Sequence, residues 1–230
     1  MIKAILMDFN GVIINDEPLH MKAYQDVLKG EGIEMTEEEY YSCLGMDDRA
    51  YIRAAYERAE KECTDEKVLE IMDAKTARWR EFVEEDVPLF EGAEDFIKKM
   101  DRDFALGIVS MARREEIEFV LEKTGLRRYF PTLVSAEDVS KHKPDPECYL
   151  IGFNLIDAAR TARGGNPMVH RDCLVIEDSP QGIEAGRRAG LKTLGIPNTV
   201  EEQRLRAAGA DSVSKGLKDW MPESVRQVFV

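Results

Sequence analysis

The sequence contains few of the residues that build disulfide frameworks or zinc sites. It has four cysteines and three histidines. The cysteines are scattered along the chain without Cys-x-x-Cys spacing, and the histidines lack metal-ligand spacing. A disulfide-stabilised secreted scaffold and a structural zinc site are therefore excluded, and the composition is typical of a reducing compartment. We expect a cytoplasmic protein.

The chain also lacks long apolar runs and an excess of positive charge. No apolar run approaches the roughly 20 residues of a membrane-spanning helix, and the first residues are those of a core strand, not of a signal peptide. The formal net charge is −13, with 45 acidic against 32 basic residues. Such a field repels phosphate backbones and anionic lipids, so we expect neither a nucleic-acid nor a membrane partner. A small anionic substrate remains compatible with this charge if a metal ion and a lysine create a local positive site. We expect a monomer.

Short apolar segments alternate with segments of helical periodicity over most of the sequence. The apolar segments, which predict strands, occupy residues 2–7, 104–109, 132–134, 173–176, 191–196 and 211–213. The first of them is a nearly continuous apolar run, as expected of a strand buried on both faces of a parallel sheet. The alternation predicts an α/β fold with a doubly wound parallel sheet, similar to a Rossmann fold.

One long segment interrupts this alternation. Residues 16–87 show helical periodicity and contain nothing that resembles a buried strand. We therefore predict an all-helical domain over 16–87, inserted as a cap into an α/β core formed by 1–15 and 88–230. The lysines of this segment, and His20 in its first helix, are predicted to lie on solvated helix surfaces.

Four groups that can support chemistry follow four different predicted strands. Asp8 ends the first strand and Ser110 follows the second, while Lys143 lies in the loop after the third and Glu177-Asp178 ends the fourth. The carboxyl ends of parallel strands open on one edge of the sheet, where α/β folds place their ligands. We expect these side chains to converge on one site. The acids would repel one another unless a cation lay between them, and their hard oxygens suit Mg²⁺.

Each of these residues also has a purely structural interpretation. Asp8 fits a turn before Gly11, since Asp-x-Asn-Gly is also turn chemistry. The two acids at 177–178 fit the N-terminus of the next helix, for which Ser179 is a plausible N-cap and Pro180 the first residue. Taken alone, Lys143 is more easily explained as a solvated lysine before a proline turn, and Ser110 as a helix cap. The convergence of all four favours a site.

Longer motifs around these residues resemble those of the haloacid dehalogenase-like hydrolases. The first is Asp8-Phe9-Asn10-Gly11-Val12, the third is Lys143-Pro144-Asp145-Pro146, and the fourth runs from Val175 to Gly186. The helical insertion after the first motif, opening with Asp16-Glu17-Pro18-Leu19-His20, is similar to that of the β-phosphoglucomutase-like subgroup. The choice of Lys143 over the nearby Lys141 depends on the proline that follows it.

The resemblance implies a role for each site residue. Asp8 would be the nucleophile that forms an aspartyl-phosphate, and Ser110 and Lys143 would bind the transferring phosphoryl group. Mg²⁺ would be held by the carboxylates of Asp8 and Asp178 and by the backbone carbonyl of residue 10. Glu177 would hold it directly or through water. The implied activity is Mg²⁺-dependent hydrolysis of a small phosphorylated metabolite, with a sugar phosphate as the favoured class.

One position departs from the family pattern. The second aspartate of the first motif, which acts in the family as general acid and base, is here Asn10. An amide does not exchange protons in this range, and general acid–base help is typically worth about 10²–10⁴-fold. Four alternatives therefore stay open: an impaired phosphatase, a phosphomutase, a phosphonatase that uses a lysine of the cap, and a silent phosphate-binding or regulatory protein.

Overall fold

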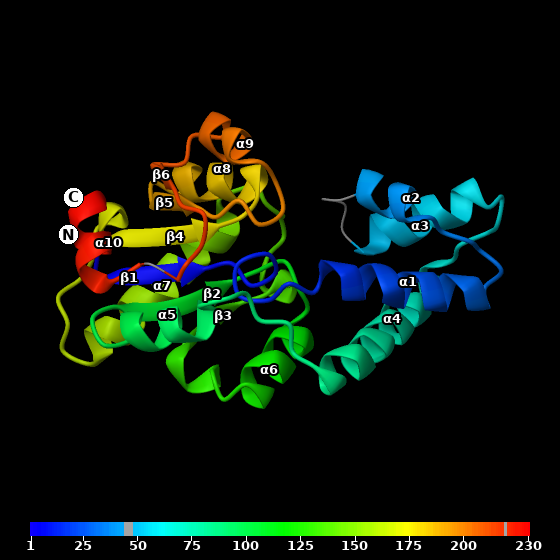
Figure 1. Ribbon diagram of the computed structural model, residues 1–230, viewed down its shortest axis with the longest axis horizontal. Helices are drawn as coiled ribbons and strands as arrows, with labels where there is room; N and C mark the ends of the chain where they lie inside the picture. Colours follow the sequence, from blue (N-terminus) through cyan, green and yellow to red (C-terminus); the bar gives the residue numbers. More distant parts are fainter. Residues whose placement is uncertain (44–47, 219) are drawn as a thin grey trace. The chain divides into compact units, whose positions relative to one another are not determined.

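The computed structural model describes residues 1–43, 48–218 and 220–230. They divide into two compact units, one formed by Met1–Asn15 with Pro88–Val230 and the other by Asp16–Val87. No helix in these described residues is both long and apolar enough to cross a membrane. The first unit is an α/β sandwich and the second is helical (Figure 1).

The α/β unit is built on six parallel strands in the order β3-β2-β1-β4-β5-β6. The strands are β1 (Ala4–Met7), β2 (Ala105–Val109), β3 (Thr132–Val134), β4 (Cys173–Glu177), β5 (Lys192–Gly195) and β6 (Ser212–Val213). All six lie within the segments predicted from apolar patterning except that β4 extends to Glu177. The predicted doubly wound α/β fold is confirmed.

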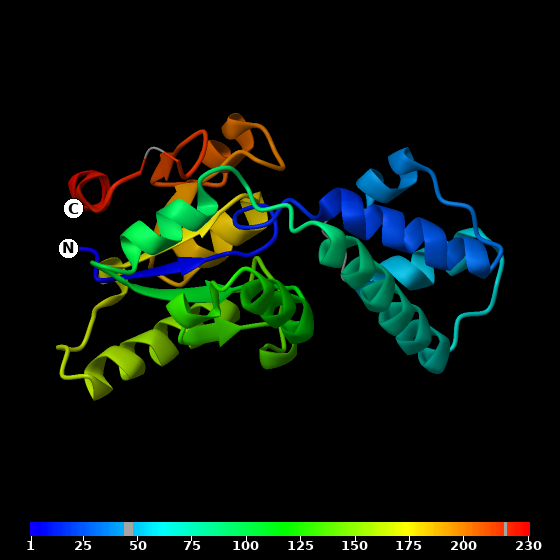
Figure 2. The same cartoon turned by 60° about the horizontal axis from the view of Figure 1, so that its bottom comes forward.

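The helices cover both faces of this sheet. They are α5 (Ala93–Met100), α6 (Arg114–Lys123), α7 (Glu147–Ala162), α8 (Pro180–Arg188), α9 (Glu202–Ala207) and α10 (Pro222–Val228). Tyr149 and Phe153 of α7 and Ala185 of α8 pack against Leu6 and Val175 in one apolar cluster, and Figures 1 and 2 show α5 on the opposite face. Both faces of the central strands are thus buried, which explains their nearly unbroken apolar sequence.

The chain order makes β1 a switch point. From β1 the chain first builds β2 and β3 on one side, then returns to build β4, β5 and β6 on the other. Met7 is in register with both Ile108 of β2 and Ile176 of β4. The residues that follow these positions therefore emerge at one level of the carboxyl edge, which is where open α/β sheets bind ligands.

The second unit contains only helices among its described residues. They are α1 (Glu17–Gly30), α2 (Glu37–Ser42), α3 (Asp48–Arg58) and α4 (Asp65–Glu85). The short helix α2 was not predicted from periodicity. Its signal was the capping box at its start, where the Thr36 hydroxyl accepts a hydrogen bond from the Glu39 N–H and the Glu39 side chain accepts one from the Thr36 N–H.

The prediction that His20 and Lys75 lie on solvated faces was wrong. His20 is only 8% exposed, stacks on Trp79 at 5.4 Å between ring centroids, and lies 3.1 Å from Asp16. Lys75 is 3% exposed and its Nζ lies 3.4 Å from an Asp48 oxygen. Packing of α1 against α4 buries these faces, and the acids of the same unit make the burial of the basic groups tolerable.

Candidate active site

The predicted site residues meet at the carboxyl edge of the sheet. The Lys143 Nζ lies 2.9 Å from Asp8 Oδ1 and 2.6 Å from Glu177 Oε1, and it also donates to the Val109 carbonyl at 3.1 Å. The Lys143 side chain is 8% exposed. This lysine therefore contacts the ends of three strands, β1, β2 and β4, that are distant in sequence. Its side chain is buried, so it is not a solvated lysine before a proline turn.

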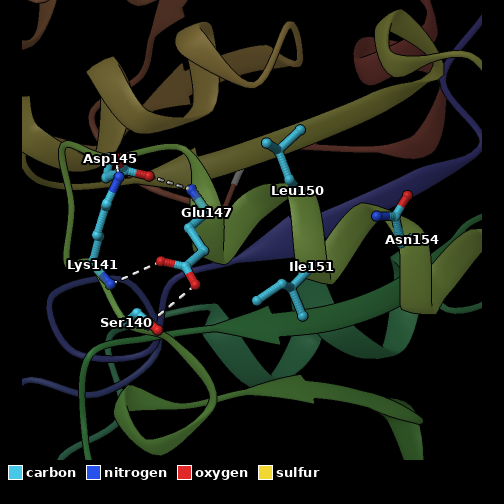
Figure 3. Close-up of a pocket in the computed structure, with 7 residues that line it drawn as sticks. All are labelled: Ser140, Lys141, Asp145, Glu147, Leu150, Ile151 and Asn154. Carbon is cyan, nitrogen blue, oxygen red and sulfur yellow. Dashed lines mark hydrogen bonds and ion pairs between the residues drawn. The ribbon is translucent and has the colours of Figure 1, made fainter.

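The loop that carries Lys143 is organised from the start of α7. Glu147 accepts hydrogen bonds from the backbone N–H groups of Ser140 and Lys141, and its own N–H donates to Asp145 Oδ1 (Figure 3). Lys141 points instead toward Asp145, at 3.8 Å, and its side chain is 72% exposed. Lys143 thus contacts Asp8 and Glu177, whereas Lys141 lies on the surface. The open depression in Figure 3 lies on the surface beside this loop and is lined by Leu150 and Ile151.

Asp8, Glu177 and Asp178 form a buried acidic cluster. Each offers a carboxylate oxygen within 4.8 Å of the others, and all three residues are buried. Burial raises the pKa of Asp8 to about 6, while Lys143 opposes this rise and Glu177 adds to it. Burial also raises the pKa of Asp178 well above its usual value, and the neighbouring charges of Glu177 and Asp8 raise it further.

Lys143 offsets only part of this negative charge. Burial disfavours its charged form, yet Asp8 and Glu177 raise its pKa above the usual value. The cluster has three carboxylates, and Lys143 forms ion pairs with two of them, Asp8 and Glu177, so the fully ionised group carries an excess of two negative charges. A divalent cation would balance this charge, and carboxylate oxygens are ligands that Mg²⁺ accepts. The donor set therefore fits the ion predicted from the sequence.

Glu177 has its own set of partners. Its Oε1 accepts hydrogen bonds from Lys143 and from the Tyr149 hydroxyl at 2.8 Å. Its Oε2 accepts from the Asp178 N–H, the Ser179 N–H and the Ser179 hydroxyl, at 3.1, 3.2 and 2.9 Å. A carboxylate offers about four lone-pair positions. Glu177 is thus saturated by protein donors and serves as an anchor between Lys143 and the start of α8.

Ser179 and Pro180 begin α8 as the sequence predicts. The Ser179 hydroxyl accepts a hydrogen bond from the Gly182 N–H at 3.0 Å, and Pro180 is the first helical residue. Glu177 also lies at the start of this helix, where it accepts hydrogen bonds from the hydroxyl and the N–H of the capping serine. Glu177 therefore contacts both the start of α8 and Lys143 of the site.

Ser110 and Asn10 face each other across the site. The Ser110 hydroxyl, in a residue that is 1% exposed, lies 3.4 Å from Asn10 Oδ1 and accepts a hydrogen bond from the Ala112 N–H at 3.1 Å. The N-cap of α6 is Arg113, so Ser110 is not the cap of that helix. Asn10 lies at the rim, where Gly11 turns the chain with a φ of +77°.

Two sets of residues beside the site were not predicted from the sequence. Tyr149 is fully buried beneath Lys143, whose Nζ lies 5.1 Å from the centre of its ring. The loop after β5 brings Asn198 to the Gly11 carbonyl, at 2.7 Å, and Thr199 to Asp178. The loop could have been predicted in the same way as the other site residues, because it also follows the carboxyl end of a predicted strand. Tyr149 had no such signal.

A family model described as haloacid dehalogenase-like hydrolase matches residues 5–196. The chain belongs to the haloacid dehalogenase-like hydrolases. The matched segment contains every candidate site residue of this hydrolase except Asn198 and Thr199.

Several named proteins resemble the chain over nearly its full length. A phosphorylated carbohydrates phosphatase of Thermotoga maritima is 28% identical over 99% of this chain and 98% of its own. Hexitol phosphatase B of Escherichia coli is 28% identical over 91% of this chain and 90% of its own. The crystal structure of CbbY from Rhodobacter sphaeroides, in complex with phosphate, has a TM-score of 0.80 at 25% identity and covers 95% of this chain and 96% of its own.

Proposed function

We propose that this hydrolase is a Mg²⁺-dependent phosphatase that acts on a small phosphorylated metabolite through an aspartyl-phosphate on Asp8. The observation that carries the proposal is the position of Lys143, whose ammonium group bridges Asp8 and the anchored Glu177 beside Asp178. Burial of Asp8 at the end of a strand disfavours its charged form, so packing alone does not explain an acid there. A nucleophile held beside a cation does explain it.

The residues that would hold the metal ion are Asp8, Asp178 and the backbone carbonyl of Asn10, with Glu177 acting through water. When bound, the ion would supply positive charge to offset the phosphate. The saturation of Glu177 by five donors favours an indirect role for it. The helical unit Asp16–Val87 corresponds in this proposal to the cap module of the family.

The chemistry of the protein residues follows from their positions. A carboxylate oxygen of Asp8 would attack phosphorus while the bond from phosphorus to the leaving oxygen breaks, and that oxygen would take a proton. Water would then attack the phosphorus of the aspartyl-phosphate, releasing inorganic phosphate and free Asp8. Lys143 and Ser110 would hold the phosphoryl oxygens by charge and hydrogen bond during both steps.

Asn10 would support this cycle without transferring the proton. Its amide can orient and hydrogen-bond the leaving oxygen, but the proton must come from solvent or from the substrate. We therefore expect slow turnover of alkyl phosphates and better turnover of aryl phosphates, whose leaving groups need little protonation. A silent phosphate-binding protein is the rival that Asn10 favours, and it would release no phosphate from either substrate type.

The named relatives suggest where to look for the substrate. They include phosphatases of phosphorylated carbohydrates and of hexitols, and a variant of CbbY was solved with xylulose-(1,5)bisphosphate. We propose a sugar or sugar-alcohol phosphate as the substrate class.

The test is Mg²⁺-dependent release of phosphate from an aryl phosphate and from a panel of sugar phosphates. Asp8→Asn and Lys143→Ala should each abolish the activity, whereas Lys141→Ala should retain it because that side chain is solvated. Wild-type activity in Asp8→Asn, with the fold verified by circular dichroism, would remove the proposed mechanism. Absence of phosphate release by the wild-type protein from every substrate would favour the silent binder.

A further inference from the structure

The loop after β5 supports the edge of the metal site in a way that no sequence motif marks. The Thr199 Oγ1 lies 2.5 Å from Asp178 Oδ2 and 3.1 Å from the Asp178 carbonyl oxygen. The adjacent Asn198 donates from its Nδ2 to the Gly11 carbonyl at 2.7 Å. Two consecutive side chains of one loop thus bind the two chain segments that carry the metal-ligand candidates.

Asp178 is confined on its other side by the backbone. A Cβ atom at Gly11 would lie 1.9 Å from Asp178 Oδ2, so the carboxylate occupies the space that a side chain at position 11 would fill. Asp178 is 5% exposed, whereas Thr199 lies at the solvent-facing rim. The carboxylate is therefore held between the Gly11 backbone and the Thr199 hydroxyl, and the hydroxyl is the part of this arrangement that a substitution can remove without a clash.

We propose that Thr199 is a positioning residue for Asp178, fixing the rotamer in which this carboxylate faces the metal site. The inference rests on the proposed function, because it takes Asp178 as a ligand of Mg²⁺. Thr199 itself touches neither substrate nor ion in this proposal. Partners that hydrogen-bond a ligating carboxylate commonly change metal affinity by about 10–100-fold when they are removed.

The chain offers a matched control within the same sheet. Thr193 of β5 is buried, and its hydroxyl lies 3.1 Å from a carboxylate oxygen of Asp211. Threonine-to-valine substitution at either position keeps the shape of the side chain and removes a hydroxyl that contacts an aspartate. Asp211 is not part of the acidic cluster, so Thr193→Val should lower stability without changing Mg²⁺ affinity.

The experiment measures Mg²⁺ binding to the protein alone, by isothermal titration calorimetry and by the rise in melting temperature with Mg²⁺ concentration. Thr199→Val should weaken Mg²⁺ affinity by about 10–100-fold, Thr199→Ser should restore most of it, and Thr193→Val should bind like the wild type. Equal affinity in Thr199→Val and the wild type would overturn the inference, as would equal losses in both valine variants. Failure of the wild type itself to bind Mg²⁺ would instead overturn the metal site of the proposed function. The two failures are therefore distinct.

Discussion

At the scale of single residues, the site contains reactive groups and anchoring groups, and the sequence alone does not distinguish the two. Asp8 and Lys143 contact each other directly and are the groups that we propose act on the substrate. Glu177, although it is an acid beside Asp178, is engaged by Lys143, Tyr149 and Ser179. The difference between an acid that can act and an acid that anchors lies in its hydrogen-bond partners, which depend on the packing around each carboxylate.

Asn10 is the residue whose chemistry limits the proposed reaction. Asn10→Asp restores a group that can protonate the leaving oxygen and deprotonate water, at nearly the same size. Hydrolysis of alkyl phosphates should rise by about 10²–10⁴-fold, and hydrolysis of aryl phosphates should rise less. Steady-state kinetics with one substrate of each type, on both proteins, measures the difference.

A matched variant separates proton transfer from a change in charge. Asn198→Asp adds an acid near the site and removes the amide that donates to the Gly11 carbonyl, so it should not accelerate hydrolysis of either substrate. If Asn10→Asp brings no gain on either phosphate, proton transfer at this position is not what limits the enzyme.

At the scale of secondary-structure elements, the close approach of α8 to the end of β4 holds the anchor in place. A Cβ atom at Gly182 would lie 1.9 Å from both Cδ and Oε1 of Glu177. Only glycine therefore lets the first turn of α8 begin directly over this carboxylate, so that Ser179 can cap the helix and bind Glu177 at once.

Gly182→Ala should displace Glu177 or the start of α8. Glu177 cannot move freely because Lys143, Tyr149 and Ser179 hold it, so we expect a loss of about 1–3 kcal/mol in the free energy of unfolding. Phosphatase activity should fall as well, since Lys143 loses its anchored partner. Urea unfolding together with the kinetic assay measures both effects.

Gly30→Ala is the control for this substitution. Nothing lies within 4 Å of a Cβ atom at Gly30, so the same added methyl group should leave stability and activity unchanged or raise stability slightly. Unchanged stability and activity in Gly182→Ala would mean that α8 shifts without strain and that Glu177 is less constrained than its contacts indicate.

At the scale of the whole molecule, the charge of the buried acidic cluster affects the stability of the protein. The buried acids have raised pKa values: that of Asp8 rises from 3.8 to about 6, and that of Asp178 rises well above the same reference. Between pH 3.8 and about 6, Asp8 holds its proton in a larger fraction of folded molecules than of unfolded ones. Stability without metal should therefore be greater at the acidic end of this range and should be lost as the pH rises through about 6.

The expected size of this effect for Asp8 is on the order of 2–3 kcal/mol. Chemical unfolding of the wild type in a chelator at pH 4.5 and 6.5 measures it, and Asp8→Asn is the control because its amide does not titrate. The wild type should lose more stability than the variant over this interval, and Mg²⁺ should restore the loss at the higher pH by balancing the ionised acids. Equal pH dependence in the two proteins would contradict the raised pKa of Asp8. Asp178 also has a raised pKa, so the test is the difference between the two proteins and not the pH dependence of the wild type alone. Asp138 and Asp172 have lowered pKa values and titrate below this interval.

By itself the sequence determined the α/β architecture and which strands end in chemically useful residues. Burial on both faces requires nearly continuous apolar strands, and this pattern survives in the linear sequence at 2–7 and 173–176. The parallel order then places Asp8, Ser110, Lys143 and Glu177-Asp178 on one edge whatever the details of packing. The periodicity of residues 16–87 likewise predicted helices, because one apolar face per helix is enough to signal them.

Only the tertiary structure decided what each of these side chains binds. His20 and Lys75 were predicted to be solvated because helix periodicity says nothing about polar groups that meet oppositely charged partners, and the contacts with Asp16 and Asp48 bury them. Tyr149 sits within an ordinary helix pattern, yet its hydroxyl reaches Glu177 across 28 residues of sequence. Thr199 reaches Asp178 in the same way from the next strand's loop. Such contacts depend on which side chains lie close together in the folded chain. Local sequence patterns predict the secondary structure but not these neighbours.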